Sequence, residues 1–193
     1  YPSRLLTALG DRLPLNDQTI EIQFISMPDD ALIAALPVAY ERYQAGQIIV
    51  NGSPEGSDTL QALSLALAGY QQIQPLKGQT IEIGDGPSII VEHASPVNNT
   101  SASSDADDAL VLRLIYKDLS LLLTGNLSAD GQKALLTDGL LPTTILQVPR
   151  SARRDSIADG FLETLLPQVA IIQVDAVSGR VSPNDDTVAR FGS

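Results

Sequence analysis

Short apolar segments that alternate with amphipathic segments of helical spacing predict an α/β fold, with sheets covered by helices. Residues Thr19–Ser26 alternate apolar and polar side chains, as a half-buried strand does. Residues Ser57–Ala68 repeat leucine at helical spacing, and either Ser57 or Asp58 is suited to cap this helix. Residues Ala109–Tyr116 and Ser120–Thr124 are two strongly apolar runs around a short polar turn, which predicts a pair of adjacent core strands.

The other elements follow the same alternation. Residues Leu5–Leu13 predict a helix that Pro14 ends. Residues Asp30–Gln44 predict a longer helix, in which Pro37 would introduce a kink. We expect Val169–Val174, a nearly continuous apolar run, to be the last core strand. The remaining expected strands are Gln47–Val50, Ile73–Leu76, Thr80–Ile83, Ser88–His93 and Thr144–Val148. The remaining expected helices are Ser128–Thr137, capped by Ser128, and Phe161–Leu166.

Length and composition predict a single domain over residues 1–193. A chain of 193 residues with 44% hydrophobic content can bury a sizeable core. Only 4% of the residues are aromatic and none is Trp, so the core must be aliphatic. Residues 94–108 are rich in Ser, Asn and Asp and predict a flexible loop, because they offer little apolar surface to bury. No run of about 18 apolar residues occurs, so we expect no direct membrane insertion.

The charge of the chain disfavours a nucleic-acid partner. Twelve basic residues face 23 acidic ones, giving a net charge of -11, whereas proteins that grip nucleic acid concentrate Lys and Arg. One basic cluster stands out, formed by Arg150, Arg153 and Arg154. Guanidinium groups match phosphate geometry, so this cluster is a candidate site for an anion or a nucleic-acid backbone. The alternative, which we favour, is a solvated loop whose arginines pair with Asp155, Asp159 or the acid-rich segment 105–108.

The chain is poor in the side chains that bind transition metals. It contains one histidine, His93, and no cysteine. Zinc sites in proteins need three or four N, S or carboxylate ligands, most of them imidazole or thiolate. We therefore expect no zinc and no metal cofactor of this kind. The lack of cysteine does not select a cellular compartment.

Two segments resemble motifs of a known family. Residues 121–126 read Leu-Leu-Leu-Thr-Gly-Asn, and residues 145–156 read Ile-Leu-Gln-Val-Pro-Arg-Ser-Ala-Arg-Arg-Asp-Ser. They resemble the Thr-Gly-Asp and Val-Pro-His-His-Gly-Ser motifs of the metallo-β-lactamase-like domain at the end of ComEC-type DNA-internalisation competence proteins. Residues Leu110–Tyr116 match a Leu-Val-Leu-Arg-Leu-x-Tyr strand of that family, and Ser182-Pro183 falls on its Gly-His-Pro segment. The resemblance extends over nearly the whole chain.

The resemblance implies a four-layer αββα sandwich with a metal site at one edge, between the sheets. The opening strands of the family, with their Asp-Val-Gly-Gln-Gly-Asp motif, are not found here, so we expect the domain to lack its first strands. The resemblance also implies a bacterial membrane protein concerned with DNA uptake as the parent. The domain itself would be soluble, and the membrane portion of its own parent would be its partner.

The resemblance locates the metal-ligand positions of the family, and the ligands have been replaced. These positions are occupied here by Met27, Asp29, Ala31, Leu32, Asn126, Arg150, Ser151 and Ser182. No imidazole remains among them. Without a bound metal there is no water of lowered pKa to attack a substrate. We therefore expect a catalytically inactive domain with a structural or interaction role, and we assign no catalytic residue.

Carboxylates leave one enzymatic alternative open. Asp29, Asp30, Asp155 and Asp175 could form a rebuilt site for Mg²⁺ or Mn²⁺, which prefer oxygen ligands, and this would make the domain a hydrolase or nuclease. The competing interpretation of Asp29 and Asp30 is a Pro-Asp-Asp turn whose carboxylates cap the helix that follows. We favour the capping turn.

Overall fold

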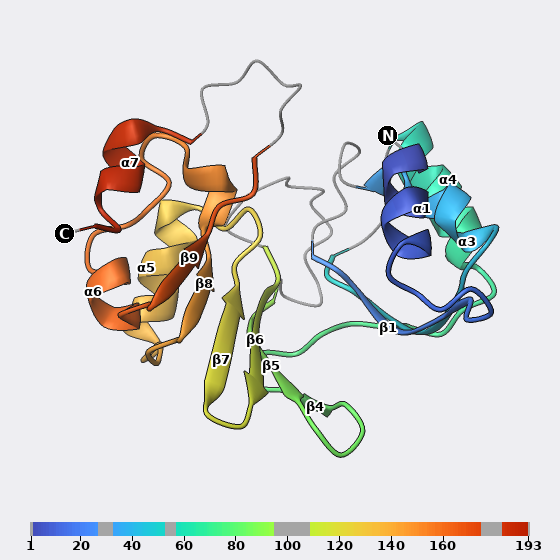
Figure 1. Cartoon of the computed structure of the whole chain (residues 1–193), viewed down its shortest axis with the longest axis horizontal. Coiled ribbons are helices and arrows are strands. Elements are labelled where there is room, and N and C mark those ends of the chain that lie inside the picture. The colour runs from blue at the N-terminus through green and yellow to red at the C-terminus, as the bar shows by residue number, and fades with distance from the viewer. Residues whose placement is uncertain (1, 27–32, 53–56, 95–108, 175–182, 193) are drawn as a thin grey trace. The chain divides into compact units, whose positions relative to one another are not determined.

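The computed structural model describes residues 2–26, 33–52, 57–94, 109–174 and 183–192, and these fall into two compact units (Figure 1). The first unit holds the described residues up to Pro75. The second holds Leu76–Ala94 and the described residues from Ala109 onward. Residues 95–108 of the predicted flexible loop lie outside the described residues, and one domain over residues 1–193 stays a prediction.

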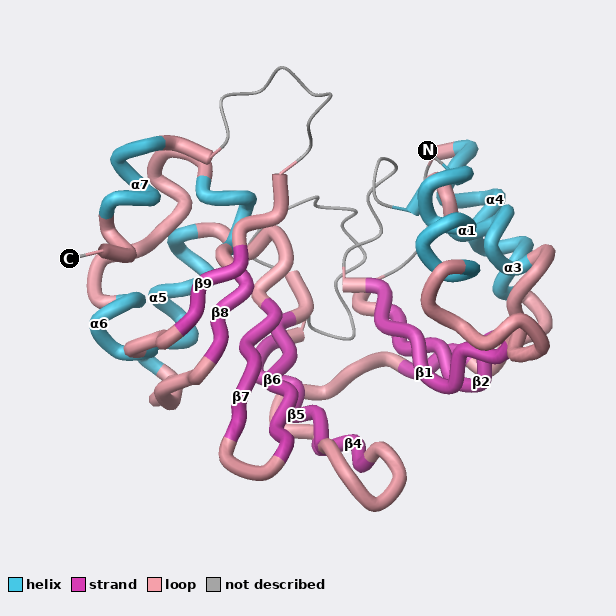
Figure 2. The backbone as a smooth tube through the Cα atoms, in the orientation of Figure 1, coloured by secondary structure: helices cyan, strands magenta, loops and turns pink. Residues whose placement is uncertain are grey.

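The first unit contains a three-stranded parallel sheet in the order β1-β2-β3. Parallel neighbours need crossover connections, and helices occur between successive strands here (Figure 2). The strands are β1 (Thr19–Ile25), β2 (Gln44–Val50) and β3 (Gln72–Ile73), and the helices are α1 (Pro2–Gly10), α3 (Leu36–Tyr40) and α4 (Asp58–Leu67).

Aliphatic side chains from α4 and the strands form the core of this unit. The Ser57 hydroxyl accepts a hydrogen bond from the Leu60 N–H at 3.2 Å and caps α4, as the sequence predicts. The buried face of α4 carries Leu60, Leu63 and Leu67 at helical spacing. They join a cluster completed by Ile25, Ile33, Ala45, Ile48 and Val50.

The long helix expected over residues Asp30–Gln44 is wrong. Ala34 and Ala35 form a turn, α3 covers only five residues, and β2 already begins at Gln44. Pro37 lies in the first turn of α3, where its missing N–H removes no intrahelical hydrogen bond. The proline therefore starts a short helix instead of kinking a long one.

The second unit contains a six-stranded mixed sheet in the order β4-β5-β6-β7-β8-β9. Strands β4 to β7 are antiparallel neighbours, whereas β8 and β9 continue the sheet in parallel to β7. The strands are β4 (Thr80–Glu82), β5 (Ser88–His93), β6 (Val111–Tyr116), β7 (Leu119–Leu123), β8 (Ile145–Gln147) and β9 (Val169–Ile171). The helices are α5 (Ala129–Thr137), the 3-10 helix η2 (Pro149–Ala152), α6 (Phe161–Leu165) and α7 (Asp185–Ala189).

The core of the second unit lies between the parallel half of its sheet and the helices. Its buried residues include Leu122 and Leu146 from neighbouring strands, Leu135 from α5 and Phe161 from α6. The Ser128 hydroxyl accepts from the Gly131 N–H at 3.1 Å and caps α5, again as predicted. In the described part of the chain, no helix is long and apolar enough to cross a membrane.

The expected core strand at Val169–Val174 is only partly correct. The strand β9 spans Val169–Ile171, and all three of its residues are exposed. The reason is its place at the end of the sheet order, where among the described strands it pairs with β8 alone. An apolar run indicates burial only when the strand has neighbours to bury it.

A buried arginine holds the antiparallel half of this sheet to the segment before β8. The Arg113 side chain on β6 is 4% exposed and forms an ion pair with Glu92 on β5. Its two terminal nitrogens donate to the backbone oxygens of Pro142 at 2.9 Å and Leu141 at 2.8 Å. These bonds satisfy the guanidinium group, as burial of a charged side chain requires.

Candidate functional site

The carboxyl ends of β7 and β8 lie side by side, and one side chain joins the loops that follow them. We call this end of the two strands the candidate-site edge. Oε1 of Gln147, the last residue of β8, accepts hydrogen bonds from the backbone N–H groups of Thr124 and Gly125, each at 3.0 Å. The Thr124 hydroxyl donates in return to the Gln147 backbone oxygen at 2.7 Å. The Arg150 N–H then donates to the Gly125 oxygen at 3.2 Å. The loop that carries Asn126 is therefore held against the loop that starts after β8.

The chain before α7 is attached to the same loop. The Asn184 N–H donates to the Ala152 backbone oxygen at 2.8 Å. The Thr187 hydroxyl donates to the Arg153 backbone oxygen at 3.1 Å. The segment that follows Ser182 in sequence thus lies beside the loop of residues 150–153.

Three of the eight predicted ligand positions can be placed. Asn126, Arg150 and Ser151 lie in the loops that follow β7 and β8, and the hydrogen bonds above bring these loops together. Asn126 is exposed, whereas Arg150 and Ser151 are half-buried. The other five positions lie outside the described residues: Met27, Asp29, Ala31, Leu32 and Ser182.

The loop after β8 has an unusual backbone. Arg150, Ser151 and Ala152 have φ angles of 52°, 54° and 53°, and Asp155 has a φ of 56°. Left-handed backbone costs an L-residue roughly 1–2 kcal/mol. The buried Ala152 and the hydrogen bonds from Arg150 and Asn184 hold this conformation in place. No glycine marks these positions, so the sequence gives no signal for the left-handed run.

The three described side chains of the candidate site, those of Asn126, Arg150 and Ser151, do not fit a transition-metal centre. Asn126 offers only a neutral amide, and Ser151 offers a hydroxyl. Arg150 carries a guanidinium group, which stays protonated and repels a dication. Among the described residues no group of three or more His, Cys, Asp or Glu side chains is placed to hold a metal ion.

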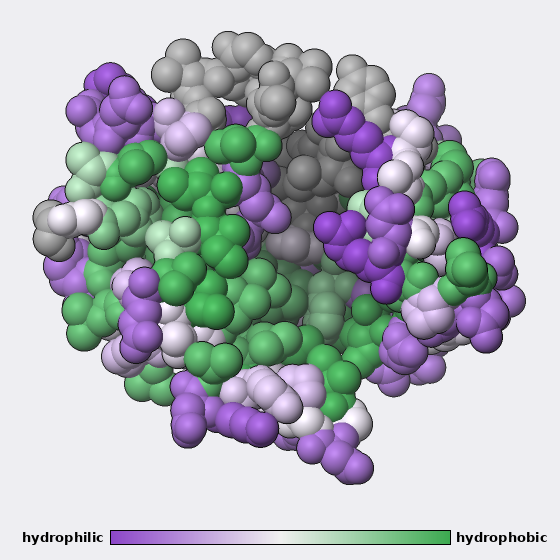
Figure 3. All heavy atoms as spheres, viewed as in Figure 1, coloured by the Kyte–Doolittle hydropathy of each residue, from purple (hydrophilic) through white to green (hydrophobic). Residues whose placement is uncertain are grey.

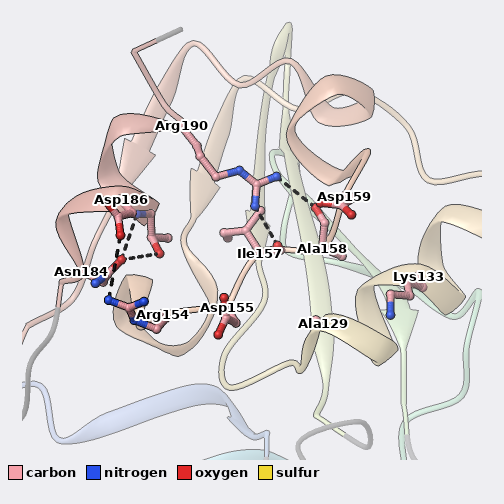
Figure 4. Close-up of a pocket in the computed structure, with 11 residues that line it drawn as sticks. Ala129, Lys133, Arg154, Asp155, Ile157, Ala158, Asp159, Asn184, Asp186 and Arg190 are labelled. Atoms are coloured by element: carbon pink, nitrogen blue, oxygen red, sulfur yellow. Dashed lines mark hydrogen bonds and ion pairs between the residues drawn. The ribbon is translucent and has the colours of Figure 1, made fainter.

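The three arginines of the basic cluster are not gathered in one pocket. Only Arg154 lines the cavity of about 350 Å³ next to α7 (Figure 4). There it faces Asp186 at 3.9 Å, and both side chains are largely exposed. The expected partners of the arginines were Asp155, Asp159 and the segment 105–108, which lies outside the described residues; the ion pair of Arg154 is instead with Asp186.

The other cations of this cavity already have partners. Arg190 donates to the backbone oxygens of Ile157 at 2.8 Å and Ala158 at 3.4 Å (Figure 4). Lys133 donates to Asp130 at 2.6 Å, and this hydrogen bond raises the pKa of the lysine. The cavity is therefore built mainly from groups that satisfy one another.

Two residues that organise this edge were missed by the sequence analysis. Gln147 was treated as part of an apolar strand, although a long amide directly before Val-Pro is suited to bond a neighbouring loop. Asn184 caps α7 by accepting from the Thr187 N–H at 3.2 Å. Its signal was available, since Asn followed by two aspartates is a typical helix start.

The chain combines sheets with helices and has the metallo-β-lactamase-like fold. This confirms the predicted fold class. The solved structures that are similar to it include two of CmlA. A mutant of the CmlA beta-hydroxylase matches with a TM-score of 0.59 and 11% identity, over 94% of this chain and 42% of that protein. CmlA, a diiron beta-hydroxylase from Streptomyces venezuelae, matches with a TM-score of 0.50 and 12% identity, over 83% of this chain and 36% of that protein.

The chain therefore spans less than half the length of these two proteins. At such low identity the likeness concerns the fold alone. No family model matches the chain, and no curated protein matches it significantly.

Proposed function

We propose that this chain is a metallo-β-lactamase-like domain of the ComEC type that has lost hydrolysis and serves a structural or interaction role in a DNA-uptake protein. One observation carries the proposal. The loops after β7 and β8 are held together as a site at the sheet edge, yet they present Asn126, Arg150 and Ser151 instead of metal ligands. In this proposal the loops of the metal site are retained, and side chains that do not bind metal replace the ligands.

Electrostatics supports the loss of hydrolysis. Hydrolysis by the family mechanism needs a metal ion that lowers the pKa of a bound water. A permanent positive charge on Arg150 at the ligand position works against binding such an ion. The adjacent cavity contains three aspartates and three cations: Asp155, Asp159, Asp186, Lys133, Arg154 and Arg190. Because the cations offset the charge of the carboxylates, the cavity is a poor place for a divalent ion, which also favours a non-hydrolytic domain.

Metal content and nuclease activity test the proposal directly. The purified chain is dialysed, analysed for metals, and incubated with single-stranded DNA in Zn²⁺, Mn²⁺ or Mg²⁺. We expect no stoichiometric transition metal and no cleavage above the buffer control. A Mn²⁺- or Mg²⁺-dependent cleavage that is lost in Asp29→Ala or Asp155→Ala would overturn the proposal in favour of a rebuilt carboxylate site.

The role in the parent protein needs a separate test in cells. Deleting the domain should lower DNA uptake, because the membrane portion of the parent loses its partner. The triple variant Asn126→Ala, Arg150→Ala, Ser151→Ala should leave uptake unchanged if no chemistry occurs at this edge. Equal loss of uptake in both would contradict a purely structural role. A full-length gene product without hydrophobic spans would contradict the proposed parent.

Nucleic-acid binding by the basic cluster is measured in the same preparation. The affinity for single-stranded DNA is measured at two salt concentrations, for the unsubstituted chain and for the double variant Arg150→Ala, Arg153→Ala. We expect weak binding that the two substitutions do not change. A salt-sensitive affinity that falls about tenfold in the double variant would assign a DNA-binding role to this loop.

A further inference from the structure

Among the described strands, β9 has a neighbour on one side only, so its other row of backbone groups has no strand partner there. The Val169 N–H donates to the Thr144 oxygen at 3.1 Å, and the Ile171 oxygen accepts from the Val148 N–H at 2.8 Å. These odd-numbered residues direct their backbone groups toward β8. Because the direction alternates along a strand, the N–H and C=O groups of Ala170 and Ile172 face the open edge.

This edge lacks two of the features that usually prevent edge pairing, charge and proline, although β9 itself is only three residues long. Residues 169–174 contain no charged residue and no proline. Val169 is 50% exposed, Ile171 45% and Val174 56%. Figure 3 shows hydrophobic side chains gathered over β9. Natural edge strands are normally protected by charges, prolines or very short length.

The other end strands of the described sheets have such protection. Strand β4 carries Glu82 and β1 carries Glu21, whereas β3 is only two residues long. The apolar character of β9 is therefore a local property and not a general feature of the sheet ends.

Apolar surface continues from β9 into a neighbouring cavity of about 360 Å³. Its lining combines apolar residues with polar and charged ones: Leu162, Leu166, Ala170 and Phe191 with Glu163, Gln168 and Arg190. Leu166 is 67% exposed beside the strand. The exposed surface is thus wider than the backbone edge alone.

We propose that β9 pairs with β9 of a second copy of this chain, antiparallel, about a two-fold axis at Ile171. In this register Ala170 and Ile172 of each copy exchange backbone hydrogen bonds with Ile172 and Ala170 of the other. Ile171 lies opposite its own copy, with about 4.5–5.5 Å between the Cβ atoms. A two-fold contact must be self-complementary, and a neutral apolar strand meets this condition.

Charge is the reason for assigning a second copy to this edge. Pairing β1 or β4 with its own copy would bring glutamates close together, whereas β9 brings no charges together. Each copy still carries a net charge of -11, so the two repel at long range. Salt screens this repulsion, and the association should strengthen as ionic strength rises.

Disulfide trapping tests the register. The chain has no cysteine, so Ile171→Cys introduces a single thiol. Under mild oxidation we expect a covalent dimer, because the two thiols would be within reach across the axis. Leu65→Cys on α4, where Leu65 is 78% exposed, is the matched control and should remain monomeric. Equal crosslinking of both variants would overturn the proposal.

A proline separates edge pairing from folding. The Ala170 N–H faces outward, so Ala170→Pro removes a donor to the second copy without removing a bond to β8. Combined with Ile171→Cys, it should abolish the covalent dimer. Circular dichroism of this double variant confirms that the chain is folded. Persistent crosslinking in the folded double variant would contradict backbone pairing at this edge.

Sedimentation equilibrium tests the association without a crosslink. The unsubstituted chain should form dimers in a concentration-dependent manner. Ile171→Lys should raise the dimer dissociation constant at least about tenfold, since the two lysines would face each other across the axis. Leu65→Lys should have no effect. The proposal would be overturned if the chain stayed monomeric at every soluble concentration while the Ala170 and Ile172 amides were protected from hydrogen exchange. Another segment of the same chain would then cover the edge.

Discussion

Thr124 and Gln147 bond to each other twice, once through each side chain. The Thr124 N–H donates to Gln147 Oε1 at 3.0 Å, and the Thr124 hydroxyl donates to the Gln147 backbone oxygen at 2.7 Å. Oε1 also accepts from the Gly125 N–H, so the turn after β7 depends on one amide of β8. These hydrogen bonds between protein groups position the loops at the carboxyl ends of β7 and β8.

Gln147→Ala should destabilise the chain by about 1–3 kcal/mol, because two backbone N–H groups lose their acceptor in a partly buried place. Urea unfolding measures the change. Gln173→Ala is the matched control, since it removes only the bond at 3.0 Å between the Gln147 and Gln173 side chains. Its effect should stay within about 0.5 kcal/mol. Equal effects of the two substitutions would mean that Gln147 does not organise the turn.

Arg113→Met should cost about 3–5 kcal/mol of stability, because it leaves Glu92 and two backbone oxygens without their donor. The comparison is Lys133→Met, which breaks the exposed pair with Asp130 and should not change the unfolding midpoint. Both are measured by thermal and urea unfolding. A small effect of Arg113→Met would show that water replaces the guanidinium group.

The left-handed loop predicts an unusual preference for glycine. Arg150→Gly should be more stable than Arg150→Ala by about 1 kcal/mol, because glycine adopts positive φ without strain. In α5 the order should reverse, and Ala134→Gly should cost about 1 kcal/mol. Urea unfolding of the three variants gives both differences. If alanine is preferred at position 150 as well, the loop is not left-handed in solution.

Tyr40 should make the stability sensitive to alkaline pH. Its hydroxyl donates to Gln23 Oε1 at 2.5 Å, and its ring lies 5.6 Å from the Tyr70 ring. Burial, and then the neighbouring Tyr70, raises the pKa of Tyr40 well above its ordinary value of 10.0. The folded state therefore holds the proton more tightly than the unfolded state. This contribution is complete below pH 10.0 and is lost as the pH rises from there toward the folded pKa.

Unfolding experiments between neutral and strongly alkaline pH check this prediction. As the pH rises above the ordinary pKa of tyrosine, the unsubstituted chain should lose stability more steeply than the Tyr40→Phe variant. Tyr116→Phe is the control, because Tyr116 is 43% exposed. Equal slopes for the parent chain and Tyr40→Phe would contradict the proposed burial effect.

Local sequence signals predicted the elements that depend on local chemistry. The serine caps of α4 and α5 were identified from sequence because Ser57 and Ser128 precede amphipathic runs. Strands β6 and β7 were placed to within one or two residues, since their apolar runs flank a short turn. The fold class followed from the alternation of such segments and from the family resemblance.

The rest depended on tertiary relationships that a local pattern does not contain. The apolar run from Val169 looks like a core strand, and only the sheet order shows that it lies at an edge. At the candidate site the family resemblance predicted which residues occupy the ligand positions, but no sequence signal predicted the left-handed loop or the role of Gln147. The position of the Arg154 side chain beside Asp186 likewise required the structure.

The mixed sheet of the second unit also sets an order for folding. Strands β6 and β7 are joined through Lys117 and Asp118 alone, so closing this hairpin restricts very little chain. Strand β8 reaches β7 only after α5 has been traversed, and β9 needs a further crossover through α6. Contacts between distant segments form more slowly than contacts between close ones. The antiparallel half should therefore form first and provide the template on which the parallel half, and with it the edge that carries Arg150, assembles last.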